Sequence, residues 1–459
     1  KGKDRLLSMV EGRPDWCVSR QRVWGVPLPI FINKKTKEPL RDQKVIDRIA
    51  SIYEKQGSDC WFTDDSKVFL GENYNPDDYE KLNDIVEVWF DSGSTHSFVL
   101  EKRKDLKWPA DMYLEGSDQH RGWFHSSLLE SCGTRGRAPF KSILSHGFVV
   151  DGKGMKMSKS TGNVISPDDI LKNYGADILR VWVASSDYAE DLRIDKSILS
   201  QHAESYRKIR NTFRFILGNI KDTYEKQNFE KIDIKQFDEL EQYILHKIFC
   251  ISKSVELNLK NYNFHKLYKE LLNFCTLDLS SFYFDIRKDV LYCDSLNSKK
   301  RRNCVKVCNI ILESLLKWFA PILVFTTDEI YSLVNKNKKN IHEHTFVKVP
   351  KNWENKKLND KWDQLLKIKQ EANIAIEAKR SSKEIGSSLE AEVKLSVDKN
   401  KFDLLENLDL SEYLITSKAE KVLSEDKEMK IEVNKAKGNK CPRCWKILEQ
   451  SCDRCASLI

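Results

Sequence analysis

Two lysines in one short segment have the type and spacing to bind a polyanion. Lys156 and Lys159 lie three residues apart in HGFVVDGKGMKMSKSTGN, among glycines and serines. Mobile ammonium groups beside an α/β domain suit a triphosphate, because they neutralise charge that spreads over the phosphate oxygens during reaction. A solvated basic loop without a ligand has the same composition, so spacing alone leaves both interpretations open.

A second polar segment, EGSDQHRGWFHSS, begins at Glu115 and follows a short apolar run. Polar groups at the carboxyl end of a strand, followed by a helix, fit a ligand crevice in an α/β sheet. A carboxylate there can hold an ammonium group, and an amide can hydrogen-bond a ribose or a carboxylate. His120, Arg121 and His125 are equally well explained as structural side chains, and we leave them outside the predicted site.

A third group lies at the end of the sequence, in CPRCWKILEQSCDRC. Two C-x-x-C pairs separated by seven residues predict a tetrahedral four-thiolate site for one structural Zn²⁺. Its ligands would be Cys441, Cys444, Cys452 and Cys455. Two local disulfides or a redox pair are the alternatives. The other eight cysteines stand in apolar contexts such as HKIFCIS, which predicts buried free thiols in a reducing compartment, the cytoplasm.

The elements that must position these groups can be read from local signals. Ser166 followed by Pro167 predicts a helix start directly after the lysine segment, and Gly175 predicts its end. The lysines are therefore expected on a loop between a strand and a helix. Up to about residue 190, glycine, proline and tryptophan with short apolar runs predict α/β structure.

From Ser197 onward the pattern is helical. Leu199, Tyr206, Phe213 and Ile220 recur every seven residues, which predicts one apolar helix face. Further helical segments predict a bundle of four or five helices, then one more helix and a strand-containing region. The later helical segments are 240–259, 267–290, 305–334 and 362–378, the expected strands are AEVKLSV and MKIEVN, and NKNKKN with the sequence up to Leu358 is expected to be a linker or exposed loop.

Composition sets broad limits on function. The 459 residues carry a formal charge of +8, which permits a polyanionic partner without requiring one. A basic flank on the first long helix, at Arg207, Lys208, Arg210 and Arg214, fits either a solvated face or phosphate contacts with RNA. No apolar run is long enough to predict a membrane span. The first residues lack both a methionine start and an apolar signal, so we expect the sequence to be cut from a longer chain.

The sequences of these segments resemble those of a known family. KMSKS, with TGN behind it and DILKNYGADILRVW following, resembles the signature loop of class I aminoacyl-tRNA synthetases. RPDWCVSRQRVWGVPLPIF, VEVWFDSGSTHSF and YLEGSDQHRGWFHSSLLES resemble the isoleucyl members, and the similarity extends over essentially the whole chain. Bacterial isoleucyl enzymes end in a similar cysteine cluster, although the spacer here is short for the family.

The resemblance implies roles for the lysine segment. Lys159 would be the main phosphate-binding lysine, and Lys156 its helper. Met157 would pack the loop down, while Ser158 and Ser160 are small enough for a tight turn. ATP, with Mg²⁺, would be the substrate held there.

The resemblance also implies an aminoacyl-adenylate site. Glu115 would contact the adenylate, with Gly116, Asp118 and Gln119 close by. Trp123 and Trp89 would line the isoleucine side-chain pocket, although tryptophans near a sheet are more often core residues. Discrimination by one methylene is worth only about 1–3 kcal/mol, which is why such enzymes edit errors at a second site.

The expected fold is multidomain, and the implied architecture has five parts. They are the second half of a Rossmann-like catalytic domain with a connective segment (1–145), the lysine loop with a stem-contact region (146–196), an all-α anticodon-binding bundle (197–350), a junction helix with a small α+β region (351–437), and a Cys₄ zinc knot (438–459). An HxGH-type motif and a threonine-rich editing domain, both expected in the family, are missing from the sequence.

The implied function is ATP-dependent activation of L-isoleucine and its transfer to tRNA(Ile) by a monomeric cytoplasmic enzyme with no membrane partner. Because half of the catalytic crevice is missing, we expect this chain alone to be inactive. Two rivals stay open at this point. One is a valyl- or leucyl-type enzyme of the same class, and the other is a non-catalytic tRNA-binding module derived from a synthetase.

Overall fold

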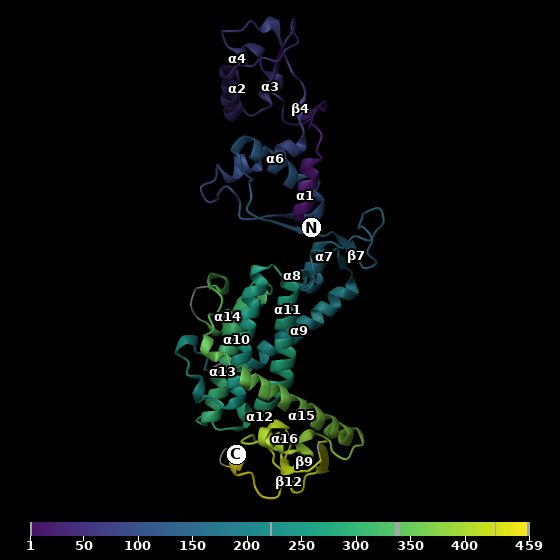
Figure 1. The fold of residues 1–459 in the computed structure, drawn as a ribbon, viewed down its shortest axis with the longest axis vertical. Helices are drawn as coiled ribbons and strands as arrows, with labels where there is room; N and C mark the ends of the chain where they lie inside the picture. The colour runs from purple at the N-terminus through teal and green to yellow at the C-terminus, as the bar shows by residue number, and fades with distance from the viewer. Residues whose placement is uncertain (1, 221–222, 336–339, 427, 457–459) are drawn as a thin grey trace. The chain divides into compact units, whose positions relative to one another are not determined.

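The computed structural model describes residues 2–220, 223–335, 340–426 and 428–456. These residues form two compact units (Figure 1). Unit 1 comprises residues 1–149 and 188–192, and unit 2 comprises residues 150–187 and 193–459.

Unit 1 contains the strand–helix arrangement that the polar segment requires. β5 (Tyr113–Gly116) pairs in parallel with β6 (Ile143–His146), and α6 (Trp123–Arg135) connects them. The polar residues after β5 therefore lie at the carboxyl end of a parallel strand, as predicted. A short 3₁₀ turn, η3 (Ser117–Arg121), separates β5 from α6.

The rest of unit 1 holds a small separate core. Phe31, Trp61 and Phe69 pack edge-on or tilted against one another, with ring centroids 5.0 and 5.1 Å apart. This core lies among short elements, so it is a local module rather than an extension of the β5–β6 sheet. The other elements of unit 1 are α1 (Gly2–Glu11), β1 (Ser19–Arg20), β2 (Phe31–Asn33), α2 (Gln43–Gln56), α3 (Cys60–Thr63), α4 (Ser66–Leu70), η1 (Pro76–Asp78), β3 (Tyr79–Lys81), β4 (Ile85–Val86), α5 (Val88–Gly93) and η2 (His96–Leu100).

The lysine segment lies between a strand and a helix, as expected. β7 (Val149–Asp151) pairs with β8 (Leu192–Ile194), and the segment leads from β7 to α7 (Pro167–Tyr174). Ser166 caps α7, since its side chain accepts a hydrogen bond from the N–H of Asp168 at 3.2 Å. Gly175, at a φ of 84°, ends α7, and α8 (Ala176–Ser185) begins at the next residue.

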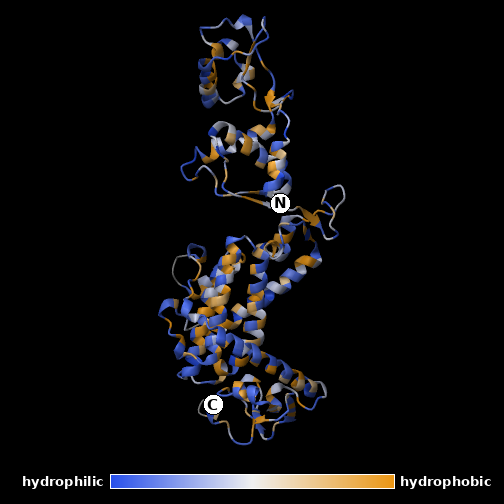
Figure 2. Ribbon diagram, in the orientation of Figure 1, coloured by the Kyte–Doolittle hydropathy of each residue, from blue (hydrophilic) through white to orange (hydrophobic). Residues whose placement is uncertain are grey.

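The helical bundle follows the predicted apolar face. In α9 (Lys196–Ile220), Leu199, Phe213 and Ile220 are buried and Tyr206 is half-buried. Figure 2 shows hydrophobic and hydrophilic residues interleaved along the bundle helices, as amphipathic helices require. The later elements are η4 (Phe229–Lys231), η5 (Ile234–Gln236), α10 (Glu239–Lys260), α11 (Phe264–Asn273), η6 (Phe274–Tyr283), α12 (Phe284–Cys293), α13 (Lys299–Phe319) and α14 (Val324–Val334).

One of the predicted helical segments is divided, and another contains a π-helical stretch. The segment over 305–334 is two helices, α13 and α14, because Pro321 has no N–H to continue the helical hydrogen bonds. The segment over 267–290 contains η6, a π-helical stretch between α11 and α12. Because α11, η6 and α12 follow one another without a gap, the described residues of the bundle contain five long helical runs, in agreement with the four or five predicted.

The segment predicted as a linker packs on the bundle instead. Ile341 and Trp353 are buried, and the indole of Trp353 stacks on Phe229 at 5.3 Å between ring centroids. This segment contains η7 (Ile341–Glu343) and η8 (Lys351–Trp353). Residues 336–339, in the NKNKKN stretch, lie outside the described residues.

The C-terminal region is a long helix followed by a three-stranded sheet. α15 (Lys356–Ser381) and β9 (Ala391–Val397) were predicted, as was β11 (Lys430–Lys435). β10 (Lys418–Leu423) was missed, because the apolar residues of its sequence KAEKVL do not alternate with polar ones. The strand order is β10–β9–β11, with β10 parallel and β11 antiparallel to β9. The remaining elements are η9 (Ser388–Glu390), α16 (Lys399–Leu404), α17 (Leu410–Tyr413), β12 (Asn439–Lys440), β13 (Ile447–Leu448) and α18 (Asp453–Ala456).

The eight scattered cysteines divide into two groups. Cys60, Cys275, Cys293, Cys304 and Cys308 are buried free thiols, as predicted. Cys17, Cys132 and Cys250 are exposed, so the prediction of burial is wrong for these three. In the part of the chain that the structure describes, no helix is both long and apolar enough to cross a membrane.

Candidate functional site

Gln119 organises the polar segment that follows β5. Its Oε1 accepts a hydrogen bond from the N–H of Trp123 at 2.9 Å, which satisfies a free donor at the start of α6, and its Nε2 donates to Asp118 at 3.2 Å. A Cβ on Gly116 would lie 2.6 Å from Asp118 Oδ1, so the Asp118 side chain would have to move to admit one. Glu115 is exposed and accepts the N–H of Gly116 at 2.9 Å. The four predicted adenylate-site residues are thus contiguous and ordered at the end of β5.

The two predicted pocket tryptophans come from adjoining helices. Trp123, at the start of α6, is half-buried, stacks on Tyr113 at 4.0 Å and donates its indole N–H to the Ser92 carbonyl at 2.9 Å. Trp89, in α5, is 40% exposed. Its ring lies against Gly122, where a Cβ would be only 2.9 Å away. Trp123 is therefore fixed by packing, whereas Trp89 presents much of its indole to solvent.

Two carboxyl groups near these indoles were missed by the sequence reasoning. Glu130 of α6 approaches α5 so closely that a Cβ on Gly93 would lie 2.1 Å from its Oε1. Burial first, and then the nearby Asp91, raise the pKa of Glu130 to about 8. Burial first, and then Glu87, raise the pKa of Asp91. The segments VWFDSG and LLESC carry no periodic signal that would have indicated this pairing.

A cationic cavity in unit 1 contains two residues that we had left outside the site. The cavity, of about 550 Å³, is lined by Arg5, Arg13, Trp16, Arg121 and His125 among others. Arg13 Nη1 lies 2.9 Å from His125 Nδ1, and its guanidinium lies over the Trp16 ring at 4.7 Å. Burial first, and then Arg13, lower the pKa of His125, which favours a neutral imidazole. The cavity is therefore chemically suited to an anionic group.

The lysine segment forms an ordered loop in unit 2. Lys156 and Lys159 are exposed, while Met157 and Ser158 are half-buried, which agrees with a packing role for the methionine. The hydroxyl of Ser158 lies 3.1 Å from that of Ser160. Because this loop belongs to unit 2 and Glu115 to unit 1, a common site for the lysines and residues 115–119, the predicted adenylate segment, stays a prediction.

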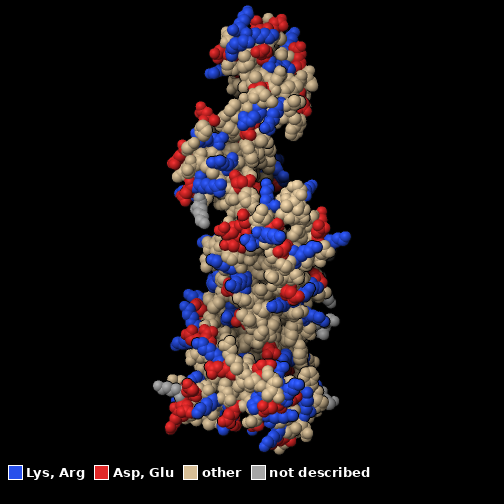
Figure 3. Space-filling model, turned by 90° about the vertical axis from the view of Figure 1, so that its right-hand side faces the viewer, with Lys and Arg blue, Asp and Glu red and all other residues tan. Residues whose placement is uncertain are grey.

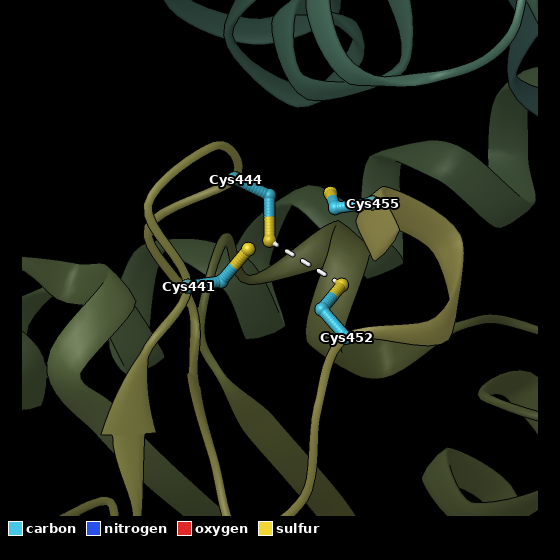
Figure 4. Close-up of side chains that lie close together, drawn as sticks. All are labelled: Cys441, Cys444, Cys452 and Cys455. Atoms are coloured by element: carbon cyan, nitrogen blue, oxygen red, sulfur yellow. Dashed lines mark hydrogen bonds between the residues drawn. The ribbon is translucent and has the colours of Figure 1, made fainter. Parts of the chain in front are cut away.

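The four C-terminal cysteines come together as predicted (Figure 4). Their sulfur atoms all lie within 4.8 Å of one another, and the sulfurs of Cys444 and Cys452 are 3.8 Å apart. A tetrahedral zinc site with Zn–S bonds of about 2.3 Å requires sulfurs about 3.8 Å apart, so the donor set fits Zn²⁺. Between Cys441 and Lys446 the chain makes a tight turn that places Trp445 at a φ of 64°.

The cysteine cluster is attached to the end of α12. Arg454 pairs with Asp289 at 2.7 Å and with Asp294 at 3.1 Å. Its guanidinium is therefore held by carboxylates of this chain rather than free to bind RNA. The Cys293 thiol donates to the carbonyl of Arg443 at 3.7 Å. Trp445 is 60% exposed, with Lys440 Nζ 5.6 Å from its ring centroid. Trp445 therefore presents much of its indole to solvent.

The basic flank of α9 is partly neutralised. Arg210 pairs with Glu329 at 3.2 Å, and Arg207 pairs with Glu204. Lys208 and Arg214 are exposed. On the face drawn in Figure 3, basic and acidic side chains are interspersed rather than gathered into one patch. The basic residues of this flank therefore do not form a patch of one sign of charge.

Comparison with known proteins gives two family matches. Residues 1–195 match the family described as tRNA synthetases class I (I, L, M and V). Residues 241–395 match the anticodon-binding domain of tRNA ligases. The first match contains the adenylate segment and the lysine loop, and the second runs from α10 into β9.

Among curated proteins, the chain is 65% identical over 454 residues to the isoleucine–tRNA ligase of Pelagibacter ubique, covering 99% of this chain and 50% of that protein. It is 45% identical to the isoleucine–tRNA ligase of Zymomonas mobilis, covering 100% of this chain and 49% of that protein. The chain thus spans about half the length of the curated relatives it matches.

Among solved structures, the LeuRS–tRNA–LeuAMS ternary complex of Agrobacterium radiobacter K84 aligns with a TM-score of 0.57 at 16% identity, over 76% of this chain and 45% of that one. That likeness shows a shared fold. The ordered KMSKS loop and adenylate segment agree with the two family matches and with the identity to isoleucine–tRNA ligases. On these grounds the chain belongs to the class I aminoacyl-tRNA synthetases, in the isoleucyl branch of that family.

Proposed function

We propose that this chain supplies the lysine-loop half of the active site, the anticodon-binding bundle and a zinc-binding knot to an isoleucine–tRNA ligase. The whole enzyme would activate L-isoleucine with ATP and Mg²⁺ and transfer it to tRNA(Ile) as a monomer in the cytoplasm. The observation that carries the proposal is an ordered loop with Lys156 and Lys159 exposed, within a chain 65% identical to an isoleucine–tRNA ligase.

In this proposal the lysines act on the triphosphate. Lys159 neutralises charge on the departing pyrophosphate, and Lys156 assists, because negative charge shifts onto the leaving group as the isoleucine carboxylate attacks the α-phosphorus. Both ammonium groups stand at the surface of the loop, where a nucleotide can reach them.

The adenylate segment would hold the other product of this step. Glu115 offers an exposed carboxylate for the α-ammonium group of the amino acid, with Gly116, Asp118 and Gln119 close by. Trp123 and Trp89 would flank the branched aliphatic side chain. The stacking of Trp123 on Tyr113 supports this role, since a wall that discriminates by one methylene must be rigid.

The zinc knot would have a structural role. Cys441, Cys444, Cys452 and Cys455 would hold one Zn²⁺ with no open position, so the ion stabilises the fold of the knot rather than taking part in the reaction. The attachment to α12 through Arg454 would place the knot beside the bundle for contacts with tRNA.

The test is Lys159→Ala in the full-length enzyme. We expect isoleucine-dependent ATP–pyrophosphate exchange to fall by about 100-fold or more, because a preorganised charge on the leaving group is lost. Affinity for tRNA(Ile), measured by filter binding, should stay within about twofold. Equal losses in exchange and in tRNA affinity would show that the loop is not dedicated to the phosphates.

A further inference from the structure

One side chain holds together the segment that carries the lysines. The carboxamide of Asn163 uses both of its ends: its oxygen accepts the N–H of Ser158 at 2.9 Å, and its nitrogen donates to the Lys156 carbonyl at 3.2 Å. The same nitrogen donates to Asp151 Oδ2 at 2.9 Å. Asn163 therefore fixes the main chain on both sides of Met157.

Asp151, the last residue of β7, anchors this arrangement. Its Oδ1 accepts the N–H groups of Lys153 and Met155 at 3.0 and 2.8 Å, while its Oδ2 accepts from Asn163. The main-chain N–H of Asp151 donates to the Met155 carbonyl at 2.9 Å. The hydrogen bond from Asn163, and then the one from the Met155 N–H, lower the pKa of Asp151, which keeps it ionised as an acceptor.

The contacts divide the loop into a pinned base and an outer turn. Residues 151–158 and Asn163 form the base through the bonds just described. Residues 159–162 form the outer turn, which is closed by weaker bonds such as Gly162 N–H to the Lys159 carbonyl at 3.3 Å. The side chain of Lys156 thus projects from the fixed backbone of the base, and Lys159 is the first residue of the outer turn.

We propose that Asn163, anchored on Asp151, is a positioning residue that sets Lys156 and Lys159 for phosphate binding. The inference rests on the proposed function of the loop and adds a residue to it. Asn163 touches no substrate group in this role. It acts through the lysines, because it fixes the direction in which both leave the main chain.

The first test is Asn163→Ala in the full-length enzyme, with pyrophosphate exchange as the readout. We expect kcat for exchange to fall by about 10- to 100-fold, since three hydrogen bonds to the loop base are lost. Asn173→Ala is the matched control, because Asn173 is an exposed asparagine of α7 whose side chain, among the described residues, donates to the Asp169 carbonyl and not to the lysine loop. That variant should keep exchange within about twofold of wild type.

A double variant separates positioning from general stability. If Asn163 acts through the lysines, Asn163→Ala combined with Lys159→Ala should be at most about threefold slower than Lys159→Ala alone. Fully multiplicative losses would overturn the proposal, because they would show that Asn163 acts independently of Lys159. Unchanged exchange in Asn163→Ala would also overturn it.

Swapping the amide and the carboxylate between positions 163 and 151 tests the proposal through the pH dependence of pyrophosphate exchange. A merely structural role of Asn163 would not change that pH dependence. Asn163→Asp places a second carboxyl group beside Asp151. The two groups share one proton below a raised pKa, and above that pKa both are charged and repel each other. Its exchange rate relative to wild type should therefore fall at least about fivefold from pH 6 to pH 8.5. In Asp151→Asn/Asn163→Asp the amide and carboxylate are swapped, so the relative rate should be flat and partly restored.

The charged groups around this pair are the same in both variants. They are Lys153 and Lys156 of the loop, with Arg193 near Gly154 and Asp195 near Gly152. Because wild type contains the same groups, their effect on the exchange rate cancels when each variant's rate is divided by the wild-type rate at the same pH. A flat profile for Asn163→Asp would contradict the proposal. If Lys159→Ala itself left exchange unchanged, the proposed function of the loop would be wrong. If Lys159→Ala slowed exchange and the Asn163 variants did not behave as expected, only the positioning role of Asn163 would be wrong.

Discussion

At the scale of single residues, Glu130 is in an environment that opposes its charge. Burial between α5 and α6, together with Asp91, raises its pKa to about 8 from an ordinary value of 4.5. Within the part of the chain that the structure describes, its buried Oε1 has no hydrogen-bond partner. A raised acid pKa means that the folded state prefers the protonated form, so the stabilising contribution is complete below about pH 4.5 and is lost as pH rises through about 8.

We therefore expect Glu130→Gln to raise the stability of unit 1 at pH 8.5 and to have little effect at pH 5. The gain should be about 1–2 kcal/mol, after discounting for partial exposure of the side chain. Thermal melting of the chain at the two pH values measures it. Glu101→Gln is the opposite control, because the hydrogen bond from Arg135 lowers the pKa of Glu101, so that variant should lose stability at pH 8.5. A melting temperature for Glu130→Gln that stays at the wild-type value at pH 8.5 would contradict the assignment.

At the scale of elements, a buried ion pair joins three helices of unit 2. Arg287 of α12 donates to both carboxylate oxygens of Glu241 in α10, at 2.6 and 2.8 Å, and to Glu412 of α17 at 2.8 Å. Arg287 and Glu241 are almost fully buried. Such a pair stabilises the fold only while it is complete, because either partner alone would be a charge in an apolar interior.

Arg287→Met should therefore destabilise unit 2 by about 3–5 kcal/mol, measured by urea unfolding. Arg287→Met combined with Glu241→Leu should recover much of this loss, since both buried charges are then removed. Arg210→Met is the matched control, because its pair with Glu329 is exposed and should be worth less than about 1 kcal/mol. An additive loss in the double variant would show that the pair is not the source of the effect.

The four C-terminal cysteines are also expected to bind one zinc ion. The purified chain should contain about one equivalent of Zn²⁺ by metal analysis, and Cys452→Ser should abolish stoichiometric binding, because three thiolates leave the tetrahedral site open. Cys250→Ser, which changes an exposed thiol of α10, should retain the metal. Helical circular dichroism should persist in Cys452→Ser, since the bundle has its own core. Full zinc content in Cys452→Ser would rule out the four-cysteine site.

At the scale of the whole molecule, the chain is short compared with its curated relatives. It spans about half the length of its curated relatives, and its sequence has no HxGH-type motif. We expect the purified chain to show no isoleucine-dependent pyrophosphate exchange above background. Circular dichroism showing folded helices serves as the control for its integrity. Robust exchange by the chain alone would mean that the lysine loop and the Glu115 segment form a complete site.

Sequence and structure agree best where a signal is local. The cap at Ser166, the end of α7 at Gly175 and the buried face of α9 depend on residues within a few positions of one another, so they were predicted correctly. The linker prediction failed at Trp353 because composition does not show that an indole stacks on Phe229. β10 was missed because its pairing with β9, rather than its own pattern, makes it a strand.

The sequence by itself predicted the family, the lysine loop between a strand and a helix, and the clustering of the four C-terminal cysteines, because each is written in a short contiguous motif. Only the tertiary structure decided the environment of Glu130, the ion pair of Arg287 and the commitment of Arg454 to Asp289 and Asp294. Arg287 is 46 positions from Glu241 and 125 from Glu412. Burial and pairing between such distant side chains arise from packing, for which a local pattern of residues has no signal.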